Sequence, residues 1–112
     1  MAHDVFKFLG GGDDLVHLSA KESEVLRHLV IGGEMYGLQI VDASGGSVGR
    51  GTVYVTLARL QDKGFVDTRQ EAQPPGASGL PRRLYCINGV GETALRRHEL
   101  AAQVLSGKGL TT

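Results

Sequence analysis

The fold is decided by residues 51–66, which read GTVYVTLARLQDKGFV. The spacing of the apolar side chains predicts a short helix that stops at Gly64 and leads directly into a strand. At roughly 100° per residue, one narrow face of this helix is apolar. That face consists of Val53, Leu57 and Leu60. In a small helical domain such a face packs in the core and leaves the opposite side of the helix free.

The opposite side of the predicted helix carries hydroxyls, one branched apolar side chain and a guanidinium. Its members are Thr52, Val55 and Arg59, with Thr56 at the margin and Tyr54 to one side. These groups suit the major groove of DNA, where Thr contacts a phosphate or base edge, Val a thymine methyl and Arg a guanine or phosphate. Arg50 precedes the helix, where free backbone amides also favour a phosphate. Taken alone, the segment favours a plain amphipathic helix with a solvated face, and the elements around it reverse that preference.

Two helices are predicted before this segment. The first begins at a capping box, in which the Ser19 side chain accepts from the Glu22 amide and the Glu22 carboxylate accepts from the Ser19 amide. Glycine pairs at 32–33 and 45–46 are expected to end the two helices. The side chains expected to point inward are Val25, Leu26, Leu29 and Val30 in the first helix, and Leu38, Ile40 and Val41 in the second.

A hairpin and a last helix are predicted after it. Residues 65–69 and 82–87 have the composition of strands. Residues 70–81 contain three Pro and two Gly, so they are expected to form the long loop of the hairpin. Residues 90–106 are expected to be helical. Three helices, a hairpin and a last helix in this order predict a mainly α fold with a small β-hairpin. Such a fold is a winged helix-turn-helix followed by a C-terminal dimerisation helix.

We therefore divide the chain into three parts. Residues 1–18 are a flexible N-terminal arm, residues 19–88 the winged helix-turn-helix DNA-binding domain, and residues 89–112 the dimerisation helix with a frayed tail. A core of about 70 residues is marginal alone, so the last helix would gain from pairing with its copy in a second subunit. The arm would either pack against that subunit or form a disordered tail. The candidate dimer contacts are Phe6, Leu95, Ala101, Val104 and Leu105.

Two arginines, Arg82 and Arg83, lie where the wing returns. A wing places such cations over the DNA backbone beside the adjacent minor groove. Since neighbouring residues in a strand point to opposite faces, one is expected to face DNA and the other solvent or Glu71. A solvated pair is the alternative. For Tyr36 we favour a buried ring over a DNA contact, and for Tyr54 both a packed ring and a hydroxyl on phosphate stay open.

Composition narrows the class of protein. The chain has 112 residues, of which 41% are hydrophobic and 21% charged, an ordinary soluble composition. It has no apolar run of about 18 residues, no secretory signal pattern and a single Cys86, so we expect a cytoplasmic protein with no membrane contact. The net charge of zero conceals −4 on residues 1–49 and +4 on residues 50–112. A basic face built from residues 50–112 is therefore compatible with a net charge of zero.

Catalytic and metal-binding patterns are missing from the sequence. The four histidines are scattered and share no metal-ligand spacing with one another or with Cys86. Residues 45–52 have neither the Lys nor the spacing of a phosphate-binding loop. We expect no enzyme activity, no cofactor and no metal.

Residues 18–106 resemble the PadR family of bacterial transcriptional regulators. MYGLQI at 35–40 resembles the start of that family's second helix, and GTVYVTLARL at 51–60 resembles its G-T-[LV]-Y-x-x-L-x-R-L signature. PRRLY at 81–85 resembles the wing strand R-[KR]-x-Y, and GETAL at 91–95 the last helix G-x-x-A-L. The third-helix signature together with the wing strand is the more specific part. The family often has Pro where this chain has Val55.

The resemblance implies a homodimeric repressor that binds a roughly palindromic double-stranded DNA operator. The positions that match the family's DNA-facing residues are Thr52, Tyr54, Thr56 and Arg59. The short last helix implies dimer contacts through that helix and the arm. A small-molecule effector of unknown identity stays open, although small family members bind flat aromatic effectors and this chain has no Trp. The alternative is a winged helix used as a protein-interaction module, which the neutral net charge favours.

Overall fold

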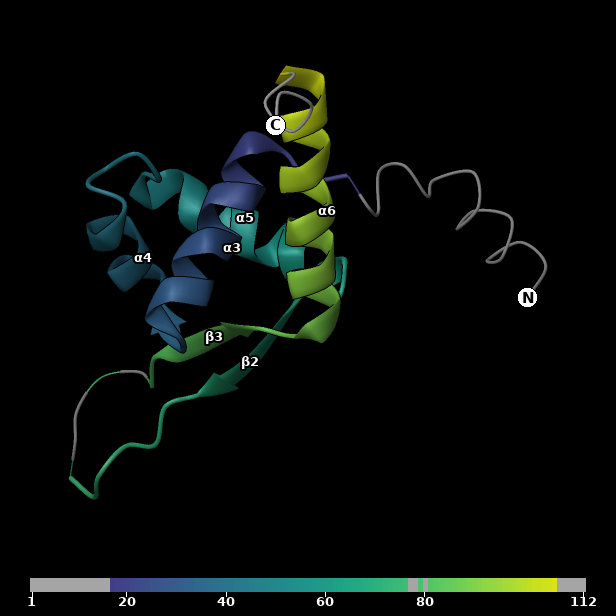
Figure 1. The fold of residues 1–112 in the computed structure, drawn as a ribbon. Helices are drawn as coiled ribbons and strands as arrows, with labels where there is room; N and C mark the ends of the chain where they lie inside the picture. The colour runs from purple at the N-terminus through teal and green to yellow at the C-terminus, as the bar shows by residue number, and fades with distance from the viewer. Residues whose placement is uncertain (1–16, 77–78, 80, 107–112) are drawn as a thin grey trace, which may run out of the picture.

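The computed structural model describes residues 17–76, 79 and 81–106. Its elements are, in order, α3 (Ala20–Gly32), β1 (Met35–Tyr36), α4 (Gly37–Ala43), α5 (Arg50–Asp62), β2 (Val66–Gln70), β3 (Arg83–Ile87) and α6 (Gly89–Ser106). In Figure 1, α3, α4 and α5 form a compact group with the sheet at one end, and α6 runs alongside α3. The predicted winged helix-turn-helix is confirmed. No helix within these residues is both long and apolar enough to cross a membrane.

Polar caps and a glycine set the helix ends where the sequence predicts them. Both halves of the capping box form: the Glu22 amide donates to Ser19 Oγ at 3.1 Å, and the Ser19 amide donates to Glu22 Oε1 at 2.9 Å. After α5, Gly64 has a φ of 79°, a left-handed conformation that side chains resist. The chain therefore leaves α5 at a sharp turn and enters β2 directly.

The sheet has three antiparallel strands, in the order β1-β3-β2, instead of the two of the predicted hairpin. The added strand β1 pairs Met35 with Tyr85 and Tyr36 with Leu84. Two residues are too few to display an alternating pattern, so this strand left no signal in the sequence. Its pairing joins the wing to the start of α4.

The core lies between the three helices and one face of the sheet. Its buried side chains include Val25, Leu26, Leu29, Ile40, Val48, Val53, Leu57, Leu60 and Phe65. Two inward predictions were wrong, because Val30 is 51% exposed and Leu38 is 45% exposed. Val30 lies about 100° around the helix from Leu29, and Leu38 about 160° from Ile40, which turns both away from the core.

Candidate nucleic-acid interface

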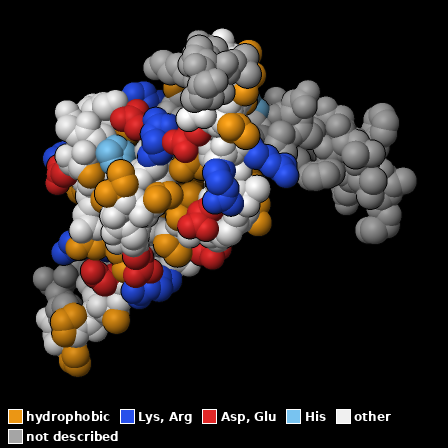
Figure 2. All heavy atoms as spheres, in the orientation of Figure 1, with side chains coloured by type: hydrophobic (Ala, Val, Ile, Leu, Met, Phe, Trp, Pro, Cys, Tyr) orange, Lys and Arg blue, Asp and Glu red, His pale blue; other side chains and the backbone are white. Residues whose placement is uncertain are grey.

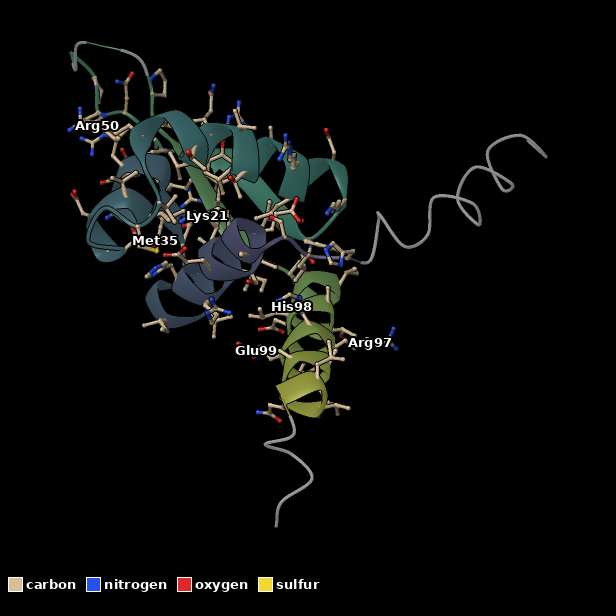
Figure 3. All side chains as sticks on the ribbon, turned by 90° about the horizontal axis from the view of Figure 1, so that it is seen from above. Lys21, Met35, Arg50, Arg97, His98 and Glu99 are labelled. Atoms are coloured by element: carbon tan, nitrogen blue, oxygen red, sulfur yellow. The ribbon has the colours of Figure 1, made fainter. Side chains whose placement is uncertain are left out.

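The outward side of α5 is open to solvent. Five predicted contact residues are exposed, namely Arg50, Thr52, Tyr54, Val55 and Arg59. The opposite face is fully buried through Val53, Leu57 and Leu60. Seen from above in Figure 3, α5 lies along one edge of the molecule and α6, which carries Arg97 and Glu99, lies across from it. The helix therefore divides into a core face and a free face, as its sequence predicts.

The start of α3 borders this free face. A groove of about 460 Å³ separates the two helices. It is lined by the N-cap Ser19 and the first two residues of α3, and on α5 by Gly51, Thr52, Val55, Thr56 and Arg59. The Lys21 ammonium reaches away to the Ser47 carbonyl and lies 3.4 Å from the Glu24 carboxylate. No ion pair between described residues involves Arg59. Its guanidinium is thus the free cation at this groove.

Thr56 does not belong to the free face. Only 4% of its surface is exposed, and its hydroxyl donates to the Thr52 carbonyl one turn earlier, at 2.8 Å. At the margin of the helix, a rotation of a few tens of degrees decides between core and solvent, and packing of α5 against α3 turns Thr56 inward. The prediction that Thr56 contacts DNA is corrected on this ground.

Tyr54 lies at the edge of α5 and packs its ring on α4. A Cβ added at Gly37 would lie 2.6 Å from the ring Cε1, so a side chain there would force the ring to move. The Tyr54 side chain is still 50% exposed and lines a cleft of about 520 Å³ between α4, α5 and the wing. Ring packing is therefore settled, and the hydroxyl stays within reach of a molecule in the cleft.

The two wing arginines have different surroundings. The Arg82 guanidinium lies 4.6 Å from the centre of the Tyr36 ring, and its Nε lies 3.8 Å from Glu71 Oε1. Arg83 donates to Thr68 Oγ1 at 3.3 Å, on the other face of the sheet. Both border the cleft that Tyr54 lines. The prediction that one arginine turns to Glu71 therefore applies to Arg82, and no ion pair between described residues involves Arg83. The Tyr36 ring is half-buried beneath Arg82.

Arg83 also influences the tyrosine behind it. Burial raises the pKa of Tyr85, and the nearby positive charge of Arg83 opposes that rise. Tyr85 and Arg83 are two residues apart on β3, so both face the same side of the sheet.

A third wing cation, Arg69, is already occupied. Its guanidinium forms two hydrogen bonds of 2.7 Å with the two carboxylate oxygens of Glu34. Those hydrogen bonds hold the pKa of Glu34 below its ordinary value and raise the pKa of Arg69. Sequence reasoning missed Glu34, because the partner lies 35 residues away and only the β1–β3 pairing brings it near.

The predicted dimer contacts on α6 divide into two groups. Leu95 is only 6% exposed and belongs to the core, so its assignment to a dimer interface is corrected. Ala101, Val104 and Leu105 are exposed, the last two at 51% and 88%. Phe6 lies outside the described residues. The physical reason for the division is the single-sided packing of α6: Leu95 falls on its inner side, toward α3.

An apolar groove of about 740 Å³ lies between α6 and the segments that carry Leu18 and Phe65. It is lined by Leu18, Phe65, Val90, Ala94 and Ala101, with Arg97 and two histidines at its sides. Val90 and Leu100 are 60% and 61% exposed and were not singled out from the sequence. Apolar residues at the helical spacing 90, 94, 101 and 104 were the signal that could have found Val90, and Leu100 lies beside this line. Figure 2 shows the neighbouring face over α3 and α6, where hydrophobic side chains alternate with charges of both signs.

Comparison with known families and structures gives one consistent result. The family model described as the transcriptional regulator PadR-like family matches residues 25–97. None of the curated protein sequences with which the chain was compared matches it significantly.

Solved structures with the same fold include three regulators. A PadR family transcriptional regulator from Eggerthella lenta is 24% identical, with 99% of this chain and 93% of that chain covered and a TM-score of 0.63. A PadR-like transcription factor from Bacteroides fragilis is 24% identical, with 76% and 84% covered and a TM-score of 0.60. A transcriptional regulator from Clostridium thermocellum is 19% identical, with 84% and 95% covered and a TM-score of 0.58.

Proposed function

Because the chain belongs to the transcriptional regulator PadR-like family, we propose that it is a sequence-specific repressor that binds double-stranded DNA as a homodimer. The single observation that carries the proposal is the free face of α5, where Thr52, Val55 and Arg59 are exposed side by side. Hydroxyl, methyl and guanidinium groups are those that read base edges in the major groove.

The contacts divide by what they recognise. Arg59 and Val55 lie at the centre of the free face and are proposed to touch bases, while Thr52 contacts a base edge or phosphate. Arg50 at the start of α5 and Arg83 on the wing are proposed to bind phosphates, which fixes the register without reading sequence. The Tyr54 hydroxyl is proposed to reach a phosphate from the edge of the cleft. Thr56 has no part in these contacts.

Dimerisation is proposed through α6. Its outer side exposes Val90, Leu100, Val104 and Leu105, and the groove beside it is mostly apolar. A small domain gains stability by burying such a surface against a second copy. A two-fold dimer would place its two α5 helices in successive major grooves, about 34–36 Å apart. The role of Phe6 in the arm is part of the same proposal.

The proposed mechanism is steric: a dimer bound at a promoter excludes the transcription machinery. This role needs neither an enzymatic activity nor a cofactor, and it places the protein in the cytoplasm with its DNA. An effector that shifts the two subunits relative to each other would release the operator, since both α5 helices must keep their spacing to bind.

Selection from random duplexes tests the proposal. Wild-type protein is incubated with a pool of random double-stranded DNA, and bound duplexes are recovered and sequenced over several rounds at fixed salt. We expect enrichment of one motif with two inverted half-sites. If the recovered duplexes are still random in sequence after several rounds, the proposal of sequence-specific binding is wrong.

The neutral net charge favours a second candidate, a winged helix that binds a protein through the free face of α5. In that case Val55 and Arg59 would face a partner protein, and duplex DNA would bind weakly without sequence preference. The same selection separates the two candidates, because only the repressor enriches a motif and binds it with a steep salt dependence.

A further inference from the structure

One apolar side chain, Val55, occupies the centre of the free face of α5. It is 50% exposed. At roughly 100° per residue, Thr52 and Arg59 lie on one side of it, and Gly51 and Ala58 on the other. A Cβ added at Gly51 would meet no atom within 4 Å, so the surface beside Val55 is open. Val55 therefore has small residues, Gly51 and Ala58, on one side and polar residues, Thr52 and Arg59, on the other.

We propose that Val55 determines operator specificity by packing against the C5 methyl group of one thymine in each half-site. The inference rests on the proposed function, since it concerns the same face of α5. An isopropyl group offers no hydrogen bond, so a base donor or acceptor set against it would lose water without replacement. In the major groove, the thymine methyl is the apolar group on the base edges.

The charges along α5 limit which part of the helix approaches the duplex. Asp62 falls on the same side as Val55, about 20° away around the helix, but at its C-terminal end. Its carboxylate would repel phosphates, whereas Arg50 at the other end attracts them. The first two or three turns therefore lie in the groove, with Val55 in their middle.

The position of Arg59 places the thymine within the half-site. Val55 and Arg59 are four residues apart, about 6 Å along the helix axis. Successive base pairs are about 3.4 Å apart. The thymine that meets Val55 is therefore expected within about two base pairs of the pair contacted by Arg59.

Removal of single methyl groups from the DNA tests the inference. In the duplex enriched by wild-type protein, each thymine is replaced in turn by deoxyuridine, which lacks only the C5 methyl. Affinities are measured by fluorescence anisotropy at fixed salt. We expect one thymine per half-site at which uracil weakens binding about fourfold, the value of one buried methyl-sized group. The Val55→Ala variant should bind the duplex with thymine and the duplex with deoxyuridine at that position equally tightly.

A matched variant controls for the loss of an exposed apolar side chain. Ile31→Ala removes a side chain that is 84% exposed on α3, and it should keep the fourfold preference for thymine. If no thymine is sensitive, or if Val55→Ala keeps the preference, the inference is wrong while the repressor assignment stands. If wild-type protein enriches no duplex at all, the proposed function fails first and the inference falls with it.

Discussion

The Lys63 ammonium at the end of α5 donates to Glu22 Oε1 in the first turn of α3 at 2.9 Å, across 41 residues of sequence. The two side chains are only 16% and 5% exposed. Lys63 also donates to the His17 carbonyl at 2.8 Å, while Glu22 caps α3 through Ser19. This ion pair fixes the angle between the two helices and so the direction in which the free face of α5 points.

The pKa of Glu22 makes this contact sensitive to acid. Burial would raise that pKa, but the hydrogen bonds from Lys63 and Ser19 outweigh burial and hold it below the ordinary value of 4.5. A carboxylate with a lowered pKa in the folded state stabilises above its unfolded value, and that stabilisation is lost as the pH falls through the folded value. Acid should therefore loosen the α3–α5 contact.

Glu22→Gln should lower the free energy of unfolding at pH 7 by about 1–3 kcal/mol, since Lys63 loses its charged partner. Urea denaturation from pH 7 to pH 3 should show the gap to wild type closing below about pH 4.5. The control is Glu99→Gln, whose ion pair with Arg27 is about half exposed and should change stability by less than about 0.5 kcal/mol. A gap that stays constant to pH 3 would contradict the account.

Gly37→Ala should disturb the packing of Tyr54. The new methyl would lie 2.6 Å from the Tyr54 ring, so the ring must move, at a cost of about 1–3 kcal/mol in the free energy of unfolding. In a Tyr54→Ala background the same substitution should cost far less, because the clash is gone. Thermal unfolding of wild type, the two single variants and the double variant completes this double-mutant cycle. If the two losses in stability simply add, the ring does not rest on Gly37.

Arg83→Ala should weaken binding to selected and scrambled duplexes alike and reduce the salt slope by about one, as the loss of one phosphate contact requires. Arg82→Ala should change the slope less, because that guanidinium rests on Tyr36 and near Glu71. The measurement is a titration at several salt concentrations. If Arg82→Ala reduced the salt slope more than Arg83→Ala did, the phosphate contact would belong to Arg82.

Val104→Asp should separate the subunits. In the proposed homodimer, a carboxylate on the apolar side of α6 would lose water without a partner, so the dimer dissociation constant should rise at least about tenfold. Sedimentation velocity of the variant and of Gln61→Asp, an exposed control on α5, measures this. If wild type is a dimer and both variants keep its mass at every concentration, the proposed interface on α6 is wrong; if wild type is a monomer at every concentration, the proposed homodimer is wrong.

Local patterns made much of the fold predictable. A capping box fixes where α3 begins, Gly64 fixes where α5 ends, and three apolar residues at helical spacing fix which side of α5 enters the core. These signals depend on neighbours within one or two turns, so they can be found without knowing the tertiary structure.

Contacts between distant segments made the rest unpredictable. Thr56 lies at the margin of α5, and only the position of α3 decides that it is buried. Which of Arg82 and Arg83 lies beside Glu71 depends on the register between β2 and β3. Strand β1 is defined only by its pairing with β3. Leu95 is an apolar residue of the predicted dimerisation helix, yet the structure buries it in the core of the same subunit.

The most direct measurement compares the affinity of wild-type and Arg59→Ala protein for the selected duplex and for a shuffled duplex of equal length, at one salt concentration. The account predicts that wild type prefers the selected duplex by about a thousandfold or more. It predicts that Arg59→Ala loses about 1–3 kcal/mol on that duplex and far less on the shuffled one. Equal affinity of wild type for both duplexes, or equal losses on both, would contradict the claim that the free face of α5 reads DNA sequence.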